Sequence, residues 1–309
     1  MSEFVILSDP SCDLSLELRE RFGVAGVIPS FVTYPDGHSE EADLDWKNIS
    51  SEAFFKALAE HPMEFKTAAA GPDLIVDTYR PFLEAGKDIL IITLSSGVSS
   101  TYQNCLYAAE MAMEQYPGRR IVVVDSMRYS TALSLMLVYA HRQQAARKSL
   151  LETADWLEKH NNRFHEMGPL DDLFFLSRVG RVSAPKAVMG TLVGIKPLAD
   201  FDLNGKSQVI GKAKGYNRAF RATIGYIKET IENPEEQIIF VAHSNRLDKA
   251  QKLVQMIEEE IRPKEVILNS VGQACGVNIG PGLIAAFYYG KPITEGLAEE
   301  TQLLNRLLK

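Results

Sequence analysis

Short apolar runs alternate with longer amphipathic segments along the first half of the chain. Each run is short and rich in Val, Ile and Leu, as in strands buried on both faces, and apolar residues at helical spacing between the runs indicate helices. Strands alternating with helices predict a parallel α/β sheet. The predicted strands are 4–7, 24–34, 88–94 and 121–126, the predicted helices are 14–22, 51–60, 73–85, 101–116 and 131–160, and the small residues 67–72 are expected to form a loop.

The second half has a different texture. Asn204-Gly205 between two apolar segments predicts a hairpin, so this half contains antiparallel strands as well as helices. The predicted strands are 173–176, 195–201, 237–242, 265–270 and 283–289, the predicted helices are 184–192, 219–231 and 246–261, and 271–282 is expected to be a glycine-rich loop. We therefore predict two α/β domains, residues 1–160 with a parallel sheet and residues 161–309 with a mixed sheet.

Polar residues follow three strands of the first half at the point where each strand ends. The strand 88–94 runs into Ser95-Ser96-Gly97, and Ser8-Asp9 and Asp125-Ser126 end two others. The carboxyl ends of parallel strands form the edge where α/β sheets bind ligands. Hydroxyls and free N–H groups before a helix make a site for an anion. A purely structural interpretation stays open, in which Ser99 or Ser100 caps the helix and Gly97 forms a turn.

Composition and charge narrow the class of protein. The 309 residues are 46% hydrophobic and 24% charged, and a net charge of −7 gives a nucleic-acid partner no electrostatic support. Cys12, Cys105 and Cys275 lie far apart and outside metal-binding spacings, which favours a reducing compartment without a zinc site. The start of the chain lacks the pattern of a signal peptide, and no apolar run approaches the ~18 residues of a membrane span. We expect a cytoplasmic protein.

Five stretches, taken together and in this order, resemble the DegV family of bacterial fatty-acid-binding proteins. The resemblance covers essentially the whole chain. The stretches are Ser8-Asp9 with Asp13-Leu14, then Leu94 to Gln103, Val124-Asp125-Ser126, Val179 to Ser183 running to Gly194-Ile195-Lys196-Pro197, and Gly276 to Gly282.

The resemblance implies a carrier rather than an enzyme. Members of this family hold one long-chain fatty acid in a tunnel between two α/β domains and present its carboxylate to a separate fatty acid kinase. The chain itself would need no metal or nucleotide, since the bound fatty acid is its ligand and ATP belongs to the kinase.

The resemblance also implies the residues that bind the carboxylate. The family uses a Thr of the small loop, a Ser of the Ser-Ser-Gly turn and a His of the last glycine loop, and the matching positions here are Thr67, Ser95 or Ser96, and Asn278. Gly97 and Gly280 are counted with them as neighbouring glycines. Two departures weaken carboxylate binding: Ala68 to Ala70 replace hydroxyl and amide donors, and Asn278 cannot carry a positive charge.

Several readings stay open beside this one. Arg181 either docks the kinase partner, as the family's Gly-Gly-Arg turn implies, or caps a turn. His243 is expected to form a structural hydrogen bond rather than act as a base, and Asp9 and Asp125 to cap helices or loops rather than share acid–base work. A serine-dependent acyl hydrolase using Ser95 or Ser96 is a second function, although no Gly-x-Ser-x-Gly elbow surrounds these serines. A carrier or sensor of a different small molecule is a third.

Overall fold

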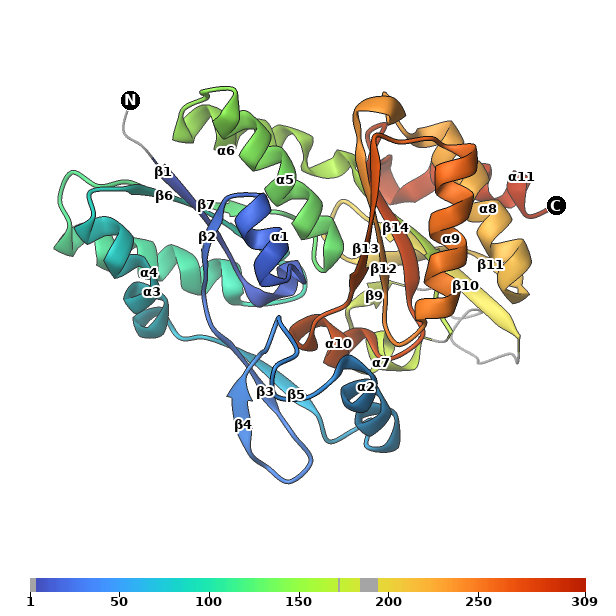
Figure 1. Cartoon of the computed structure of the whole chain (residues 1–309), viewed down its shortest axis with the longest axis horizontal. Coiled ribbons are helices and arrows are strands. Elements are labelled where there is room, and N and C mark those ends of the chain that lie inside the picture. The colour runs from blue at the N-terminus through green and yellow to red at the C-terminus, as the bar shows by residue number, and fades with distance from the viewer. Residues whose placement is uncertain (1–3, 172, 184–193) are drawn as a thin grey trace. The chain divides into compact units, whose positions relative to one another are not determined.

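The computed structural model describes residues 4–171, 173–183 and 194–309 (Figure 1). The chain divides into two compact units. Unit 1 comprises Met1–Asn48, Met63–Asn161 and Gly272–Cys275, and unit 2 comprises Ile49–Pro62, Asn162–Val271 and Gly276–Lys309.

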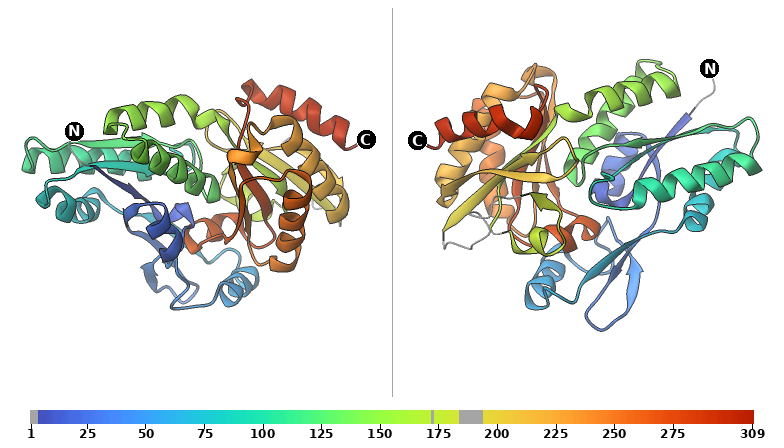
Figure 2. Two further views of the ribbon diagram at one scale, coloured as in Figure 1. Left: turned by 45° about the horizontal axis from the view of Figure 1, so that its top comes forward. Right: turned by 180° about the vertical axis from the view of Figure 1, so that it is seen from behind.

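Unit 1 is built on a four-stranded parallel sheet, as the apolar runs predict. The strand order is β2-β1-β6-β7, and all six residues of the central strand β6 are buried. Helices α3 and α4 cover one face of the sheet and α5 and α6 cover the other (Figures 1 and 2). The bounds are β1 Phe4–Ser8, β2 Val24–Val27, β6 Asp88–Thr93, β7 Ile121–Asp125, α1 Leu16–Arg21, α3 Pro72–Glu84, α4 Thr101–Gln115, α5 Thr131–Ala145 and α6 Leu150–His160, with a short 3-10 helix at Pro10–Cys12.

A small antiparallel sheet completes unit 1, in the order β4-β3-β5. Its strands are β3 Ser30–Thr33, β4 Ser39–Glu41 and β5 Lys66–Ala69. The predicted single strand 24–34 is wrong, because its two parts pair in different sheets on either side of Ile28-Pro29. The predicted loop 67–72 is wrong at its start, because Thr67 pairs with Val32 within β5.

Unit 2 contains a seven-stranded mixed sheet, which confirms the predicted sheet type. The order is β13-β12-β14-β8-β10-β11-β9, with β12 parallel to β13, β9 parallel to β11 and antiparallel pairs elsewhere. The predicted hairpin at Asn204-Gly205 joins β10 to β11. The strands are β8 Phe164–Pro169, β9 Val182–Ser183, β10 Ile195–Phe201, β11 Ser207–Lys214, β12 Ile238–His243, β13 Glu265–Ser270 and β14 Ile284–Tyr289.

Helices α8, α9 and α11 pack on one face of this sheet (Figures 1 and 2). The helices of unit 2 are α2 Ser51–Glu60, α7 Phe174–Arg178, α8 Gly215–Thr230, α9 Leu247–Glu260 and α11 Ala298–Leu307, with 3-10 turns at Asn161–Arg163, Pro234–Glu236 and Glu295–Leu297. The division between the units falls inside α10 Gln273–Ile279.

Four other predictions were wrong. Helix α1 is capped by Ser15 and begins after it, rather than at 14. The predicted helix 131–160 is two helices, because Ser149 and Glu152 form a capping box that starts α6. The predicted strand 173–176 is part of α7, since an apolar run this short does not distinguish a strand from a helix. The predicted loop 271–282 contains α10. The predicted helix 184–192 lies outside the described residues.

A buried polar cluster joins strands β8, β10 and β14 of unit 2 to helix α8. The Nδ1 atom of His165 lies 2.6 Å from Oδ2 of Asp200, and its Nε2 lies 2.8 Å from the carbonyl oxygen of Lys291. The hydroxyl of Tyr226 donates to Asp200 at 2.8 Å, and the ring of Tyr288 stacks on His165 with centroids 5.1 Å apart. Since Asp200 and His165 are almost fully buried, these contacts satisfy polar atoms that water does not reach.

Candidate functional site

The turn after β6 presents one serine to solvent and buries the other. Ser96 is exposed, whereas Ser95 is fully buried and its Oγ accepts the N–H of Gly97 at 3.0 Å. The N-cap residue of α4 is Ser100, whose side chain makes no capping hydrogen bond, whereas Ser99 Oγ accepts the N–H of Thr101 at 3.2 Å from the position before the cap. The Ser96 hydroxyl is therefore the better placed of the two serines to meet a ligand.

Two carboxylates hold this turn in place. Asp9 accepts the N–H of Leu94 at 2.7 Å, and Asp125 accepts the N–H of Ser96 at 3.1 Å. Both aspartates thus bind loop N–H groups, which confirms the expectation that they are structural. The expectation of free N–H donors is wrong for Leu94, Ser95 and Ser96. The N–H groups of Leu94 and Ser96 bind Asp9 and Asp125, and the nitrogen of Ser95 lies 2.7 Å from the carbonyl oxygen of Arg128, which accepts its N–H.

Burial controls the ionisation of groups near this edge. It raises the pKa of Asp9, and it raises the pKa of Asp13 to about 7 even though Ser130 and Gly272 donate hydrogen bonds to Asp13. Burial also raises the thiol pKa of Cys12 to about 12. A buried thiol with a raised pKa is a poor nucleophile, so Cys12 is a packing residue.

Thr67 lies on β5 in the same unit, and its side chain is exposed. The segment that follows β5 is tied to the first turn of α4, because Asn104 donates to the carbonyl oxygen of Ala70 at 2.8 Å. The residues expected to form a small-residue loop are thus the end of a strand that is attached to α4 through its backbone.

Asn278 and Gly280 belong to unit 2, at the end of α10. Asn278 is half-buried, and Gly280 has a positive φ of 76°. A Cβ atom at Gly280 would lie 2.1 Å from Cδ2 of Phe175, so only glycine fits between this backbone and the ring.

Arg181 lies in the turn that follows α7. Its N–H donates to the carbonyl oxygen of Leu176 at 3.0 Å, and its half-buried side chain donates to the carbonyl oxygen of Val179. This contact is the turn-capping geometry considered as the alternative to partner docking.

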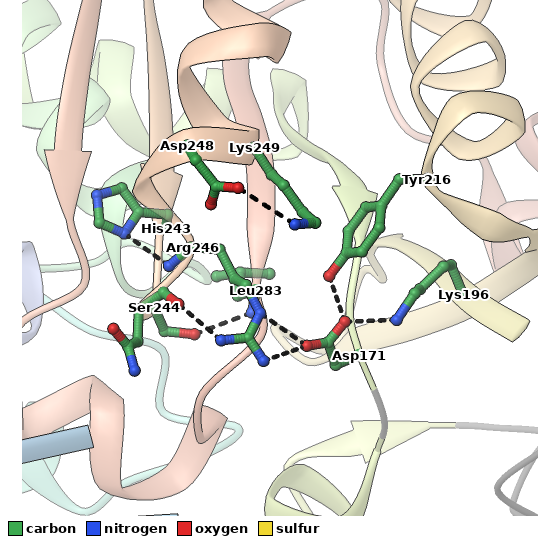
Figure 3. Close-up of polar contacts among 10 residues, drawn as sticks. Asp171, Lys196, Tyr216, His243, Ser244, Arg246, Asp248, Lys249 and Leu283 are labelled. Carbon is green, nitrogen blue, oxygen red and sulfur yellow. Dashed lines mark hydrogen bonds and ion pairs between the residues drawn. The ribbon is translucent and has the colours of Figure 1, made fainter. Parts of the chain in front are cut away.

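Sequence reasoning missed an ionic cluster in unit 2 centred on Asp171 (Figure 3). Asp171 accepts hydrogen bonds from Lys196, Tyr216 and Arg246, the last through Nε at 2.9 Å and Nη2 at 2.6 Å. Although burial acts to raise it, these donors hold the pKa of Asp171 below its usual range. The cluster joins β10, α8 and α9 to the end of β8, and the separate sequence positions give no signal of it. Lys196 therefore has a structural role in this cluster.

His243 is placed beside this cluster at the end of β12. Its Nδ1 accepts the N–H of Arg246 at 3.3 Å, and burial lowers its pKa. The contact confirms the structural hydrogen bond expected for His243.

Two arginines with little exposure, Arg128 and Arg178, were also not identified from the sequence. Arg128 is 1% exposed in unit 1, where Nη1 donates to the carbonyl oxygen of Met127 at 2.6 Å. Arg178 of α7 is half-buried and contacts the backbone beside Asn278. Arginine usually lies on the surface, so hydropathy does not reveal a buried one.

The pockets found among the described residues lie away from the residues predicted for the site. One pocket of unit 1, of about 680 Å³, is lined by residues of α1 and β2. Another, of about 490 Å³, is lined by residues that include Arg119 and Ser149. Neither pocket is lined by a residue predicted for the site. No group of three or more metal-ligating side chains occurs among the described residues. Among the same residues, none of the helices has the length and apolar character needed to span a membrane.

Comparison with known proteins gives one consistent family. The family model described as "Uncharacterised protein, DegV family" matches residues 3–291. A DegV domain-containing protein of Clostridium perfringens is 29% identical over 292 residues, which cover 94% of this chain and 98% of the relative.

Solved structures share the fold. A DegV family protein of Thermus thermophilus, whose structure is described by its fatty acid binding, is 26% identical with a TM-score of 0.78, covering 94% of this chain and 100% of that one. A stearic acid-binding protein of Eubacterium ventriosum gives 21% identity and a TM-score of 0.80, covering 93% and 98%. The Fatty Acid Kinase B3 protein of Streptococcus pneumoniae, loaded with linoleic acid, gives 16% identity and 0.77, covering 94% and 100%.

Proposed function

Because the chain belongs to the DegV family, whose model matches residues 3–291, we propose that it is a carrier that holds a long-chain fatty acid. The observation that carries this proposal is the likeness, over nearly the full length of both chains, to the Thermus thermophilus protein described by its fatty acid binding. No cofactor is part of the proposal, because the fatty acid is the ligand.

The proposed head-group residues are those implied by the family motifs. In unit 1 they are Thr67, Ser95, Ser96 and Gly97, of which the exposed Ser96 hydroxyl is the strongest candidate. In unit 2 they are Asn278 and Gly280. A carboxylate removed from water needs several hydrogen-bond donors, and Ser96 and Asn278 supply a hydroxyl and an amide.

The finer parts of the proposal concern partners and organisation. A separate fatty acid kinase would phosphorylate the bound carboxylate in the cytoplasm, with Arg181 as the docking residue. The Fatty Acid Kinase B3 protein among the structural neighbours supports a kinase partner by analogy. The division into domains 1–160 and 161–309 is retained as part of the proposal.

Of two alternative functions, a hydrolase has less support than a carrier for a different small molecule. A serine-dependent hydrolase has little support, because no Gly-x-Ser-x-Gly elbow surrounds Ser95 or Ser96, and His243 Nδ1 already accepts the N–H of Arg246. A carrier for a different small molecule is favoured by the two departures from the family motifs, Ala68 to Ala70 and Asn278.

Mass spectrometry of the freshly purified protein tests the proposal. Native spectra before and after organic extraction, together with analysis of the extract, should show one fatty acid per chain that disappears on extraction. The matched control is the Ser96→Ala variant, which should carry less fatty acid at unchanged fold. A protein that neither retains a fatty acid nor binds added oleate would contradict the carrier function, and a bound molecule without an acyl tail would favour the alternative carrier.

A further inference from the structure

Helix α7 contacts α10 through the side chain of Arg178. The Nη2 atom of Arg178 donates to the carbonyl oxygen of Val277 at 2.9 Å, and Nη1 donates to the carbonyl oxygen of Pro62, just after α2. The guanidinium also lies over the ring of Phe175, 5.2 Å from its centroid. One arginine thus joins α7 to the backbone of two other segments of unit 2.

A second contact from α7 reaches α10 three residues further along. The ring of Phe175 lies against the backbone of Gly280, where an added Cβ would come within 2.1 Å of the ring. Phe175 is 7% exposed, so this contact is part of the packed interior of unit 2. The N–H of Gly280 donates to the carbonyl oxygen of Gly276 at 2.7 Å, which makes Gly280 continuous with the end of the helix.

These two contacts bracket Asn278. Val277 precedes it directly, and Gly280 follows two residues later, so α7 fixes the backbone on both sides of the amide side chain. Helix α2 supports α10 at Gly276, where an added Cβ would lie 3.0 Å from Phe55 and 3.3 Å from Phe54. The end of α10 is therefore held by α7 and α2 together, and its orientation depends on both.

We propose that Arg178 is a positioning residue that fixes the direction in which Asn278 presents its amide to the head group of the ligand. The inference rests on the proposed function, because it concerns the same fatty acid carboxylate. A hydrogen bond from a charged guanidinium to a carbonyl is stronger than a neutral one, and it is directional. Ligand-binding side chains need support of this kind, because a small displacement of the donor weakens binding.

The chain offers a matched control in Arg163. This arginine also donates to a backbone carbonyl, that of Gly290 at 3.2 Å, and also lies over an aromatic ring, 5.5 Å from the centroid of Tyr289. It forms an ion pair with Glu232 at 2.8 Å. Arg163→Gln therefore removes similar interactions from unit 2 without touching the backbone beside Asn278.

A double-mutant cycle tests the proposal with oleate as the probe. Dissociation constants are measured by calorimetry for the wild type, Arg178→Gln, Asn278→Ala and the double variant. We expect Arg178→Gln to weaken binding about tenfold in the wild-type background and less than about twofold beside Asn278→Ala, because two residues that act as a unit are not additive. Arg163→Gln should leave the affinity unchanged, and Arg178→Lys should restore part of it.

Equal losses from Arg178→Gln in the two backgrounds would overturn the proposal, as would an equal loss from Arg163→Gln. If the wild type does not bind oleate, the proposed function is refuted, and the positioning role needs a test that does not depend on the ligand. Hydrogen exchange of a peptide that spans residues 273–280 is this test. Faster exchange in this peptide for Arg178→Gln, but not for Arg163→Gln, supports the positioning role. Unchanged exchange refutes it.

Discussion

The carboxylate of Asp13 accepts the backbone N–H of Gly272 at 2.8 Å, although 259 residues separate the two along the chain. Both residues belong to unit 1. A Cβ atom at Gly272 would lie 2.9 Å from Oδ1 of Asp13, so a glycine allows this close approach. Asp13 is buried and also accepts a hydrogen bond from the hydroxyl of Ser130. Its carboxyl group therefore links the start of the chain to a segment near the end.

Asp13 should make stability depend on pH. Burial raises its folded-state pKa from 3.8 to about 7, so between these values the folded chain retains a proton that the unfolded chain has lost. Folding stability from this group is complete below about pH 4 and falls as the pH rises towards 7, with a slope of at most about 1.4 kcal/mol per pH unit. Urea unfolding between pH 5 and 8 should show a smaller decrease for Asp13→Asn than for the wild type.

The control for this titration is Asp248→Asn. Asp248 is exposed, and the hydrogen bond from Lys249 lowers its pKa, so its removal should not change the slope between pH 5 and 8. Parallel slopes for the wild type and Asp13→Asn would show that Asp13 does not titrate in this range.

Ser95→Ala and Ser96→Ala should affect different properties, the first the stability of the fold and the second the binding of the ligand. Ser95 Oγ accepts the N–H of Gly97 in a buried position, so its removal should destabilise the fold by about 1–3 kcal/mol. Ser96 is exposed, so its removal should leave the midpoint of urea unfolding unchanged while weakening the binding of oleate. Unchanged affinity in a binding titration of Ser96→Ala would remove this hydroxyl from the site.

Asn278→His should tighten the binding of a fatty acid. A partly protonated imidazole adds a charge-assisted hydrogen bond to a carboxylate, which a neutral amide does not provide. The gain in oleate affinity should be larger at pH 6 than at pH 8, because the imidazole is more protonated at pH 6. A titration at both values that shows equal or weaker binding would mean that the family's head-group arrangement does not apply to this chain.

Asp200→Asn should destabilise unit 2 strongly. His165 and Tyr226 both contact the Asp200 carboxylate in a region closed to water, so neutralising it leaves a buried network partly unsatisfied, at a cost of about 3 kcal/mol. Urea unfolding measures the change. Glu260→Gln, which removes an exposed ion pair with Lys228, is the comparison and should have little effect, because such pairs contribute little. Similar midpoints for the two variants would refute the importance of the cluster.

Arg181→Glu should separate ligand binding from partner binding. The docking proposal expects normal oleate affinity together with lost phosphorylation in the presence of a fatty acid kinase, because the reversed charge repels the partner surface that arginine attracts. Paired assays of binding and phosphorylation measure both. If the two fall together, Arg181 acts through the turn that its side chain caps at Val179.

The sequence predicted the parts of the fold that depend on local signals. The strand β6 and the hairpin at Asn204-Gly205 follow from an apolar run and a turn dipeptide, and both lie where they were expected. The positions of Ser95 and Ser96 at the end of β6 follow from the same rule. Helix α10 was missed, because several glycines suggest a loop, whereas in the structure Gly276 of this helix packs closely against Phe54 and Phe55 of α2.

The supporting contacts of the site could not be predicted. Arg178 and Val277 are 99 residues apart in the chain, and neither residue type indicates the bond between them. Asp171 and Arg246 are separated by 75 residues, and their pairing depends on the order of strands in the sheet. Such contacts depend on the tertiary fold, whereas the motif residues are identified by their neighbours in the sequence.

The return of Gly272–Cys275 to unit 1 has a consequence for biosynthesis. A ribosome makes the chain from its N-terminus, and domains of contiguous sequence fold as soon as they emerge. Unit 1 cannot complete its folding as its first residues emerge, because the hydrogen bond between Asp13 and the N–H of Gly272 forms only after residue 272 has been made. During synthesis the nascent protein therefore carries an incomplete unit 1 until residues 272–275 have been made.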